Sequence, residues 1–328
     1  MEIVAADIGG TNARFAIAEL RPGERPLVAE IFKYPAEAHD GLVSAWEQFE
    51  RDLGREPPKA AAIAVATGLG EDILRFANSA WVIDRRSIAA ELGLDRMLLL
   101  NDFGAMAHGV SVLPEAEMAH LLGPQGPLPE AGITTVIGPG TGLGVAMILR
   151  RAGHIHIIET EGAHMGFAPL DEEEERIEHE LRLRYGRCSI ERVVSGPGLL
   201  DVYQALGGRS YEDDIPLWTA ALAGNDPAAR DALERMVKAF GSAAGDLALA
   251  HGSNAVVISS GLSRRMASHL RTKLFAGRFI AKGRYRRRME AMPVKLVLHE
   301  ETGLLGAAVA FQREQPVDAR AEPEVPRN

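Results

Sequence analysis

The chain has 328 residues, of which 46% are hydrophobic and 25% charged, and its formal net charge is −9. This length and composition predict an ordinary globular protein with two domains. The acidic balance argues against sequence-independent binding of nucleic acid, which needs cations to neutralise phosphates. The single cysteine, Cys188, cannot form an internal disulfide or a cysteine-rich zinc site, and we interpret it as a small buried hydrophobe.

The first residues lead directly into an apolar, strand-like run. No positively charged segment precedes an apolar one, and no apolar run approaches 18 residues. We therefore expect a cytoplasmic protein that does not contact a membrane.

Two strand-like runs, over 3–6 and 15–18, flank a loop rich in glycine and polar residues, which predicts a β-hairpin. The loop reads Asp7-Ile8-Gly9-Gly10-Thr11-Asn12-Ala13-Arg14. Its glycines would let the backbone approach a ligand and adopt positive φ, and its polar side chains add donors. Asp7 could hold a hydrated Mg²⁺. The combination indicates a phosphate site; the alternative is an ordinary hairpin whose Asp and Asn only shape the turn.

The residues that follow alternate between strand and helix patterns. We expect strands over 27–34, 60–66, 78–83 and 97–100, and helices over 41–53, 87–92 and 105–110. The run over 60–66 is almost wholly apolar, as in a strand that is buried on both faces. This alternation predicts an α/β architecture with a partly parallel sheet.

A second hairpin repeats the opening design. Strands expected over 133–137 and 145–149 flank the loop Gly138-Pro139-Gly140-Thr141-Gly142-Leu143-Gly144. One glycine-rich loop is weak evidence for phosphate binding, but two in one chain strengthen it. They suggest a duplicated domain whose two loops face one ligand.

The remainder is mainly helical. A surface connection is expected over 122–132, helices over 171–185, 199–205, 226–251 and 302–311, and strands over 255–259 and 294–299. The basic run over 284–288 is interpreted as a solvated face. The tail from Gln315 is rich in proline and charge and is expected to be frayed.

Asn101 and Asp102 follow directly after an apolar strand, where open α/β sheets place their sites. Asp102 could act as a general base on a hydroxyl that Asn101 helps to hold. The alternative, equally weighted on position alone, is that the pair caps a helix.

Glu161 and His164 form a second polar cluster. The spacing is not that of a helical zinc motif and no third ligand is evident, so we favour hydrogen bonding to a polyol over metal binding. Glu191 beside Arg192 is interpreted from the sequence alone as an ion pair on a helix.

These motifs resemble, in the same order, those of the bacterial ATP-dependent glucokinases, a family of the hexokinase/actin-like ATPase superfamily. The resemblance extends from residue 7 to about 311. It is carried by the two glycine-rich loops, by Asn101-Asp102-Phe103, and by the runs 161–169, 190–198, 282–285 and 301–307.

The resemblance implies an α/β fold of the two-domain ribonuclease H-like (actin/hexokinase) type with a cleft between the domains. A small domain over 1–110 would be completed by a C-terminal helix over 301–314. A large domain would span 111–300, and 315–328 would form a flexible tail.

It also implies ATP-dependent phosphorylation of glucose at the 6-hydroxyl, with Asp102 as general base. The sugar-binding residues would be Asn101, Asp102, Glu161, His164 and Glu191. The nucleotide would contact Gly9, Gly10, Thr11, Asn12, Gly140, Thr141, Gly142 and, near the adenosine, Gly261. Asp7 would help to hold Mg²⁺, directly or through water, and a homodimer is expected.

The sequence departs from the family pattern at two places. Ser260 stands where a glycine is usual near the adenosine, and the proline usual near Gly68 is missing. We expect no structural zinc and no fused DNA-binding domain. Alternatives are a kinase for another hexose, such as mannose, fructose or an amino sugar, a non-catalytic sugar sensor, and an actin- or chaperone-like ATPase that moves partner proteins.

Overall fold

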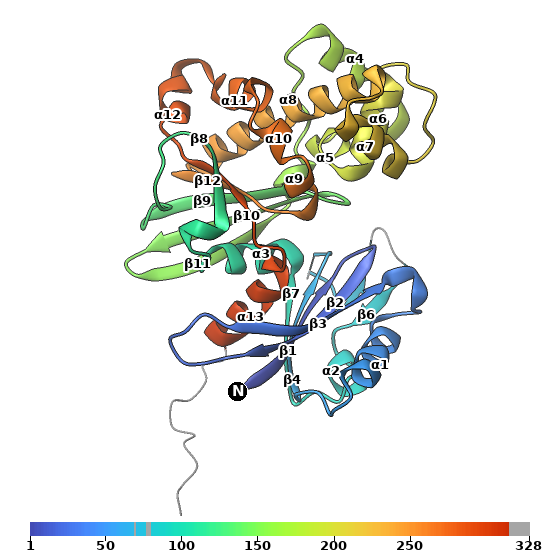
Figure 1. Cartoon of the computed structure of the whole chain (residues 1–328), viewed down its shortest axis with the longest axis vertical. Helices are drawn as coiled ribbons and strands as arrows, with labels where there is room; N and C mark the ends of the chain where they lie inside the picture. The colour runs from blue at the N-terminus through green and yellow to red at the C-terminus, as the bar shows by residue number, and fades with distance from the viewer. Residues whose placement is uncertain (69, 77–79, 315–328) are drawn as a thin grey trace, which may run out of the picture. The chain divides into compact units, whose positions relative to one another are not determined.

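The structure is a computed structural model that describes residues 1–68, 70–76 and 80–314. The start of the strand predicted over 78–83 and the tail from Gln315 lie outside the described residues. The chain divides into two compact units, one formed by residues 1–112 and the chain from Glu301, the other by residues 113–300 (Figure 1). Each unit is described by itself below.

The first unit is built on a sheet with strand order β3-β2-β1-β4-β7. The bounds are β1 (Glu2–Ile8), β2 (Asn12–Glu19), β3 (Leu27–Pro35), β4 (Ala60–Val65) and β7 (Arg96–Asn101). The hairpin strands β1, β2 and β3 pair antiparallel, whereas β1, β4 and β7 pair parallel. A small separate hairpin joins β5 (Ile73–Arg75) to β6 (Val82–Asp84).

Both faces of this sheet are buried, as the apolar run over 60–66 predicts. On one face, Ile63 and Val65 pack with the aromatic cluster of Phe15, Trp46 and Phe49, which α1 (Leu42–Leu53) completes. On the other face, alternate residues such as Ala62 and Ala64 pack against α13 (Thr302–Glu314) and α3 (Asp102–Val110). The short helices here are η1 (Ala36–Ala38) and α2 (Ile88–Glu91).

The second unit repeats this topology. Its sheet has the order β11-β10-β9-β12-β13-β8. The bounds are β8 (Met118–Leu122), β9 (Gly132–Pro139), β10 (Leu143–Arg151), β11 (His154–Thr160), β12 (Ala255–Ile258) and β13 (Val294–Val297). The first five positions reproduce the pairing directions of the other sheet, and β8 is added antiparallel at the edge. The duplication predicted from the two hairpins is therefore confirmed at the level of topology.

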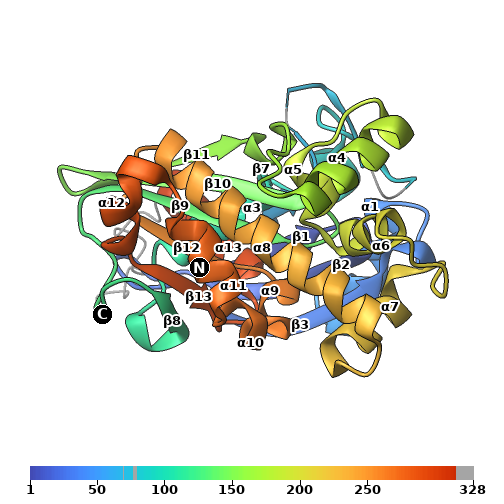
Figure 2. The same ribbon diagram turned by 90° about the horizontal axis from the view of Figure 1, so that it is seen from above.

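A helical layer covers the second sheet. Its longest element is α8 (Pro227–Ala250), seen running across this unit in Figure 2. The other helices are η2 (Glu115–Glu117), η3 (Gly162–His164), α4 (Glu172–Tyr185), α5 (Ile190–Val193), α6 (Gly196–Ala205), α7 (Asp214–Ala223), α9 (Gly261–Arg265), α10 (Ala267–Leu270), α11 (Lys273–Ile280), η4 (Gly283–Tyr285) and α12 (Arg286–Glu290). No helix built from the described residues is long and apolar enough to cross a membrane.

Several elements were not predicted. The edge strand β11 contains His154, His156 and Glu159 and is half exposed along its length, so its sequence lacks a continuous apolar signal. Strand β8 ends at Leu122, the residue at which the sequence predicted that a surface connection begins. The helices α7 and α11 were also not predicted. Their positions depend on packing against α8 rather than on a strong local pattern.

Candidate functional site

The first glycine-rich loop closes the hairpin between β1 and β2. The Gly9 N–H donates to the Asn12 carbonyl oxygen at 3.0 Å, which fixes the turn. The prediction of positive φ was wrong, because neither Gly9 nor Gly10 is among the glycines that adopt it. A Cβ at Gly9 would lie 3.6 Å from the Asn12 carbonyl oxygen, an ordinary contact. These glycines therefore leave the partly exposed backbone of the turn uncovered by side chains rather than relieve strain.

Asp7 and Arg14 are cross-strand partners in this hairpin. The Arg14 Nη1 donates to Asp7 Oδ2 at 3.1 Å, so the cation of the predicted phosphate loop is paired with Asp7. Burial raises the pKa of Asp7; the charge of Arg14 opposes this shift and the carboxylate of Glu301 adds to it. Asp7 thus lies between one cation and a second carboxylate.

The N-terminus of α13 adjoins the Asp7 carboxylate. A Cβ at Gly303 would lie 3.0 Å from Asp7 Oδ2. Glu301, which precedes the helix, has a buried Oε2 with no hydrogen-bond partner among the described residues. Two neighbouring carboxylates with an unsatisfied buried oxygen are a donor set that suits Mg²⁺. The motif over 301–307 pointed to this segment, but no role for Glu301 was predicted.

Across residues 1–68, 70–76 and 80–314, no cluster of three or more His, Cys, Asp or Glu side chains could hold a metal ion. Mg²⁺ does not require such a cluster, because it keeps several waters and binds through one or two carboxylates together with substrate phosphates.

Asn101 and Asp102 lie at the junction of β7 and α3, and the structure divides their roles. Asn101 caps the helix: its Oδ1 accepts from the N–H groups of Phe103 at 2.9 Å and Gly104 at 3.1 Å. Its Nδ2 donates to the Thr67 carbonyl oxygen at 3.3 Å. Asp102 is the first residue of the helix, and its Oδ1 accepts from Phe103 N–H at 2.8 Å. The cap prediction therefore holds for Asn101, and Asp102 is a partly exposed carboxylate in the first turn.

The parallel register brings these groups to one edge of the sheet. Ile8 is level with Val65, and Val65 with Asn101. The Ala66 N–H donates to the Ile8 carbonyl oxygen at 3.0 Å, which ties the next loop to the end of β1. The first unit thus carries the Asp7 hairpin and the Asn101–Asp102 pair at the carboxyl ends of β1 and β7, with β4 between these two strands.

The second glycine-rich loop joins β9 to β10. The Gly140 N–H donates to the Gly142 carbonyl oxygen at 2.7 Å, and the Gly140 carbonyl oxygen accepts from Gly196 N–H at 2.7 Å. Thr141 is exposed at the tip. Glu191 Oε2 accepts from the Leu143 N–H at 2.9 Å, so a residue predicted to bind sugar contacts the predicted phosphate loop.

The expected Glu191–Arg192 ion pair is replaced by other contacts. The Arg192 guanidinium lies over the Tyr185 ring, 3.9 Å from its centroid. Glu191 faces the loop instead, as described above, and the helix that carries it is the single turn α5.

Glu161 is the N-cap of the short helix η3, and His164 is its last residue. The His164 Nε2 lies 3.7 Å from Glu161 Oε2, and the two side chains are 58% and 72% exposed, which leaves both accessible to a polyol. The backbone that follows pairs with the segment before Glu191: Ile190 N–H donates to the Met165 carbonyl oxygen at 2.9 Å. Glu161, His164 and Glu191 therefore belong to two adjacent, hydrogen-bonded segments.

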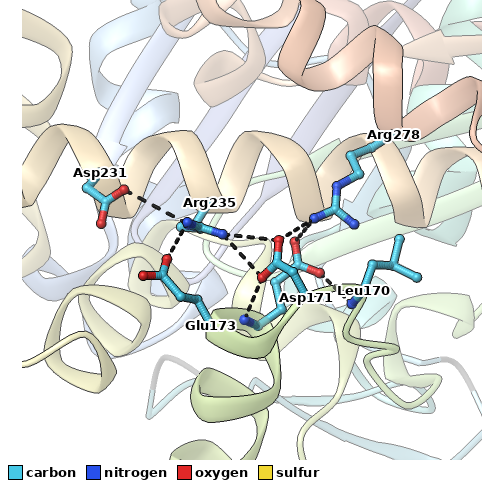
Figure 3. Close-up of polar contacts among 7 residues, drawn as sticks. Leu170, Asp171, Glu173, Asp231, Arg235 and Arg278 are labelled. Atoms are coloured by element: carbon cyan, nitrogen blue, oxygen red, sulfur yellow. Dashed lines mark hydrogen bonds and ion pairs between the residues drawn. The ribbon is translucent and has the colours of Figure 1, made fainter.

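A dense ion-pair network fixes residues 170–174, which follow the segment that contains Glu161 and His164 (Figure 3). Asp171 caps α4 and binds Arg235 of α8 at 3.1 Å and Arg278 of α11 at 2.7 Å. Arg278 also binds Glu174 at 2.9 Å, and Glu174, which is only 2% exposed, accepts from the Leu170 N–H at 2.8 Å. Arg235 contacts Glu173 and Asp231 as well. The network anchors the chain that follows Glu161 and His164 onto the helices α8 and α11.

Two further residues were singled out in the sequence. Ser260 is the N-cap of α9, where its Oγ accepts from Ser263 N–H at 2.9 Å, and the next residue, Gly261, is exposed. Cys188 is buried as predicted, and burial raises the pKa of its thiol to about 12, which keeps it protonated and unreactive.

The duplicated sheet, with a glycine-rich hairpin in each half and a carboxylate at a strand end, defines a two-domain ribonuclease H-like protein of the actin/hexokinase class. The glucokinase family model matches residues 4–314. A glucokinase of Zymomonas mobilis is 47% identical over 95% of this chain and 98% of the relative. A glucokinase of a Caulobacter species is 37% identical over 94% of each chain.

Among solved structures, a glucokinase from an Antarctic psychrotroph matches with a TM-score of 0.80 and 28% identity, covering 95% of this chain and 99% of that one. The chain therefore belongs to the glucokinase family.

Proposed function

We propose that this protein transfers the terminal phosphoryl group of ATP to the 6-hydroxyl of glucose, giving glucose 6-phosphate and ADP, with Asp102 as general base. The observation that carries this proposal is the position of Asp102 in the first turn of α3, at the same end of the first sheet as the Asp7 hairpin. Membership of the glucokinase family supports the same reaction.

Asp102 is suited to the role of base by its surroundings. It is partly exposed at the start of a helix, where the helix dipole favours a negative charge. Asn101 is held by the two N–H groups it caps, so it presents its amide in one orientation. We propose that Asn101 positions the sugar and that Asp102 accepts the proton of the 6-hydroxyl as the new O–P bond forms.

The other sugar contacts are proposed from the second unit. Glu161 and His164 are exposed, and Glu191 offers a carboxylate on an adjacent segment. Carboxylates accept hydrogen bonds from hydroxyls, and a neutral imidazole can donate or accept. These three residues would select a polyol by its pattern of hydroxyl groups.

The nucleotide is proposed to bind through the two hairpin loops. Gly9, Gly10, Thr11 and Asn12 in one unit and Gly140, Thr141 and Gly142 in the other would present backbone and hydroxyl donors to the phosphates. Gly261, the first residue of α9, is proposed to contact the nucleotide near the adenosine. Asp7, with Glu301 beside it, would hold the Mg²⁺ that accompanies the nucleotide. Bound Mg²⁺ would neutralise phosphate charge, which together with positioning supplies most of the catalysis in phosphoryl transfer.

The test is production of ADP from ATP with Mg²⁺, with and without glucose, followed by a panel of hexoses. ADP release that requires glucose and yields glucose 6-phosphate supports the proposal. Turnover with another hexose alone would keep the mechanism and change the substrate. Glucose binding without any sugar-dependent ADP release would favour a sensor.

Two further properties follow from the family resemblance and remain proposals. We propose a homodimer, to be checked by light scattering after size-exclusion chromatography. We also propose that the protein acts in the cytoplasm, to be checked by cell fractionation.

A further inference from the structure

One hydrogen bond links the proposed sugar residues to the proposed phosphate loop. Glu191 Oε2 accepts from the Leu143 N–H at 2.9 Å, across 48 residues of sequence. A Cβ built on Gly142 would overlap this carboxylate, with the Glu191 Cδ only 3.2 Å away, and its three nearest neighbours are all Glu191 atoms. The Glu191 carboxylate thus fills the space beside the backbone of the loop.

The segment around Glu191 is hydrogen-bonded both to the loop over 140–142 and to the chain that follows His164. After α5, the Gly196 N–H donates to the Gly140 carbonyl oxygen at 2.7 Å, so this segment holds the loop at a second point. Before α5, residues 188–190 pair with 165–167 through the Phe167 N–H and the Ile190 N–H. The segment over 188–196 therefore connects the part of the chain with Glu161 and His164 to the loop over 140–142.

A carboxylate can serve both partners at once. It has two oxygens with about four lone-pair sites, so Oε2 can keep the Leu143 N–H while Oε1 accepts from a sugar hydroxyl. A sugar that fixes the Glu191 rotamer also fixes the oxygen that holds the loop. A loop that is already ordered costs less conformational freedom when it closes on phosphates.

We propose that Glu191 is a coupling residue, which binds a sugar hydroxyl and the Leu143 N–H together, so that sugar and nucleotide each raise the affinity for the other. This rests on the proposed function, in which Glu191 contacts the sugar and Gly140, Thr141 and Gly142 contact phosphates. Linkage makes the effect reciprocal, and couplings of this kind are typically about 5- to 150-fold.

Two glycine variants form a matched pair. Gly142→Ala adds a methyl group that displaces the Glu191 carboxylate, whereas Gly277→Ala in α11 adds one where nothing lies within 4 Å and no proposed ligand contact is near in sequence. Neither glycine has a positive φ, so alanine is not strained at either position. Glucose binding is measured by calorimetry without nucleotide. We expect Gly142→Ala to weaken glucose binding about tenfold, because it displaces a charged hydrogen-bond partner of the sugar, and Gly277→Ala to leave it unchanged.

The coupling itself is the ratio of the Kd for Mg-AMPPNP without glucose to the Kd with saturating glucose. We expect a ratio of at least about 5 in the unmodified protein and near 1 in Gly142→Ala. If Gly142→Ala does not fold, Glu191→Ala replaces it, with the same expected ratio near 1, because it removes both oxygens that would serve the loop and the sugar.

A ratio near 1 in the unmodified protein, or full coupling in the variants, would overturn the proposal. Failure of the proposed function is recognised separately, because the unmodified protein would then show no glucose binding or no turnover.

Discussion

The crossing of α3 and α13 fixes the helix that carries Asp102, and Gly306 makes this crossing close. A Cβ at Gly306 would overlap the Ala105 carbonyl oxygen and lie 2.6 Å from the Ala105 carbonyl carbon and 2.8 Å from the Gly109 nitrogen. Ordinary contact begins at 3.4 Å, and all of these atoms are backbone. Gly306→Ala would therefore force the two helices apart by about 1 Å, since no side chain can move out of the way.

The magnitude follows from two opposing effects. Overpacking of this kind costs up to about 3 kcal/mol, and alanine gains up to about 1 kcal/mol over glycine as a helix former. We expect a net loss of about 2 kcal/mol. A displacement of about 1 Å at a catalytic group can cost about 10²-fold in rate, so we expect kcat to fall by about that factor.

Urea unfolding and glucose-dependent ADP release measure the two effects. Gly277→Ala in α11 is the matched control, because nothing lies within 4 Å of its Cβ position. We expect it to keep full activity and gain up to about 1 kcal/mol. Gly109→Ala tests the same crossing from the α3 side, where a Cβ would lie 2.9 Å from Thr302 Cγ2. A Gly306→Ala protein with unchanged stability and kcat would refute the reasoning.

Three further predictions concern charge and capping. Burial lowers the pKa of His108 from 6.5 to about 4, so between these pH values the folded protein binds fewer protons than the unfolded chain. Acidification from pH 6.5 to 4 should therefore lower the free energy of unfolding by about 3 kcal/mol, and thermal melts at several pH values should show a weaker pH dependence for His108→Gln. Arg278→Met removes the ion-pair partner of the buried Glu174 carboxylate and should lower the free energy of unfolding in urea by about 3–5 kcal/mol. The control Arg286→Met breaks an exposed pair with Glu290 and should cost under about 1 kcal/mol, so equal costs for the two variants would contradict the account. Ser260→Gly should change the calorimetric Kd for ATP less than about threefold and the stability by only a few tenths of a kcal/mol, because glycine is also tolerated as a cap; a tenfold gain in ATP affinity would show that Ser260 obstructs the nucleotide.

The two hairpins could be predicted because their signals are local. Apolar runs flank Gly9-Gly10 and Gly140-Thr141-Gly142, and the strands form where these runs lie. The end of β7 was also evident, since an apolar run stops abruptly at Asn101. The sequence alone left two roles open for Asn101 and Asp102, and only the capping geometry separates them.

Other features depend on contacts between distant residues. Arg14 pairs with Asp7 because of the strand register, which the loop sequence does not reveal. The Glu191–Leu143 contact and the Glu301 carboxylate beside Asp7 join segments far apart in the chain. Edge strands such as β11 carry polar residues on their exposed positions and so lack the apolar run that identified the central strands.

The role of Asp102 as general base is the central claim, and the Asp102→Asn protein tests it most directly. Glucose binding by calorimetry and steady-state ADP release are measured on the same preparation. We predict a glucose Kd close to that of the unmodified protein and a kcat lower by about 10²- to 10⁴-fold, the usual contribution of a general base. Unimpaired turnover would contradict the account and remove Asp102 from the mechanism.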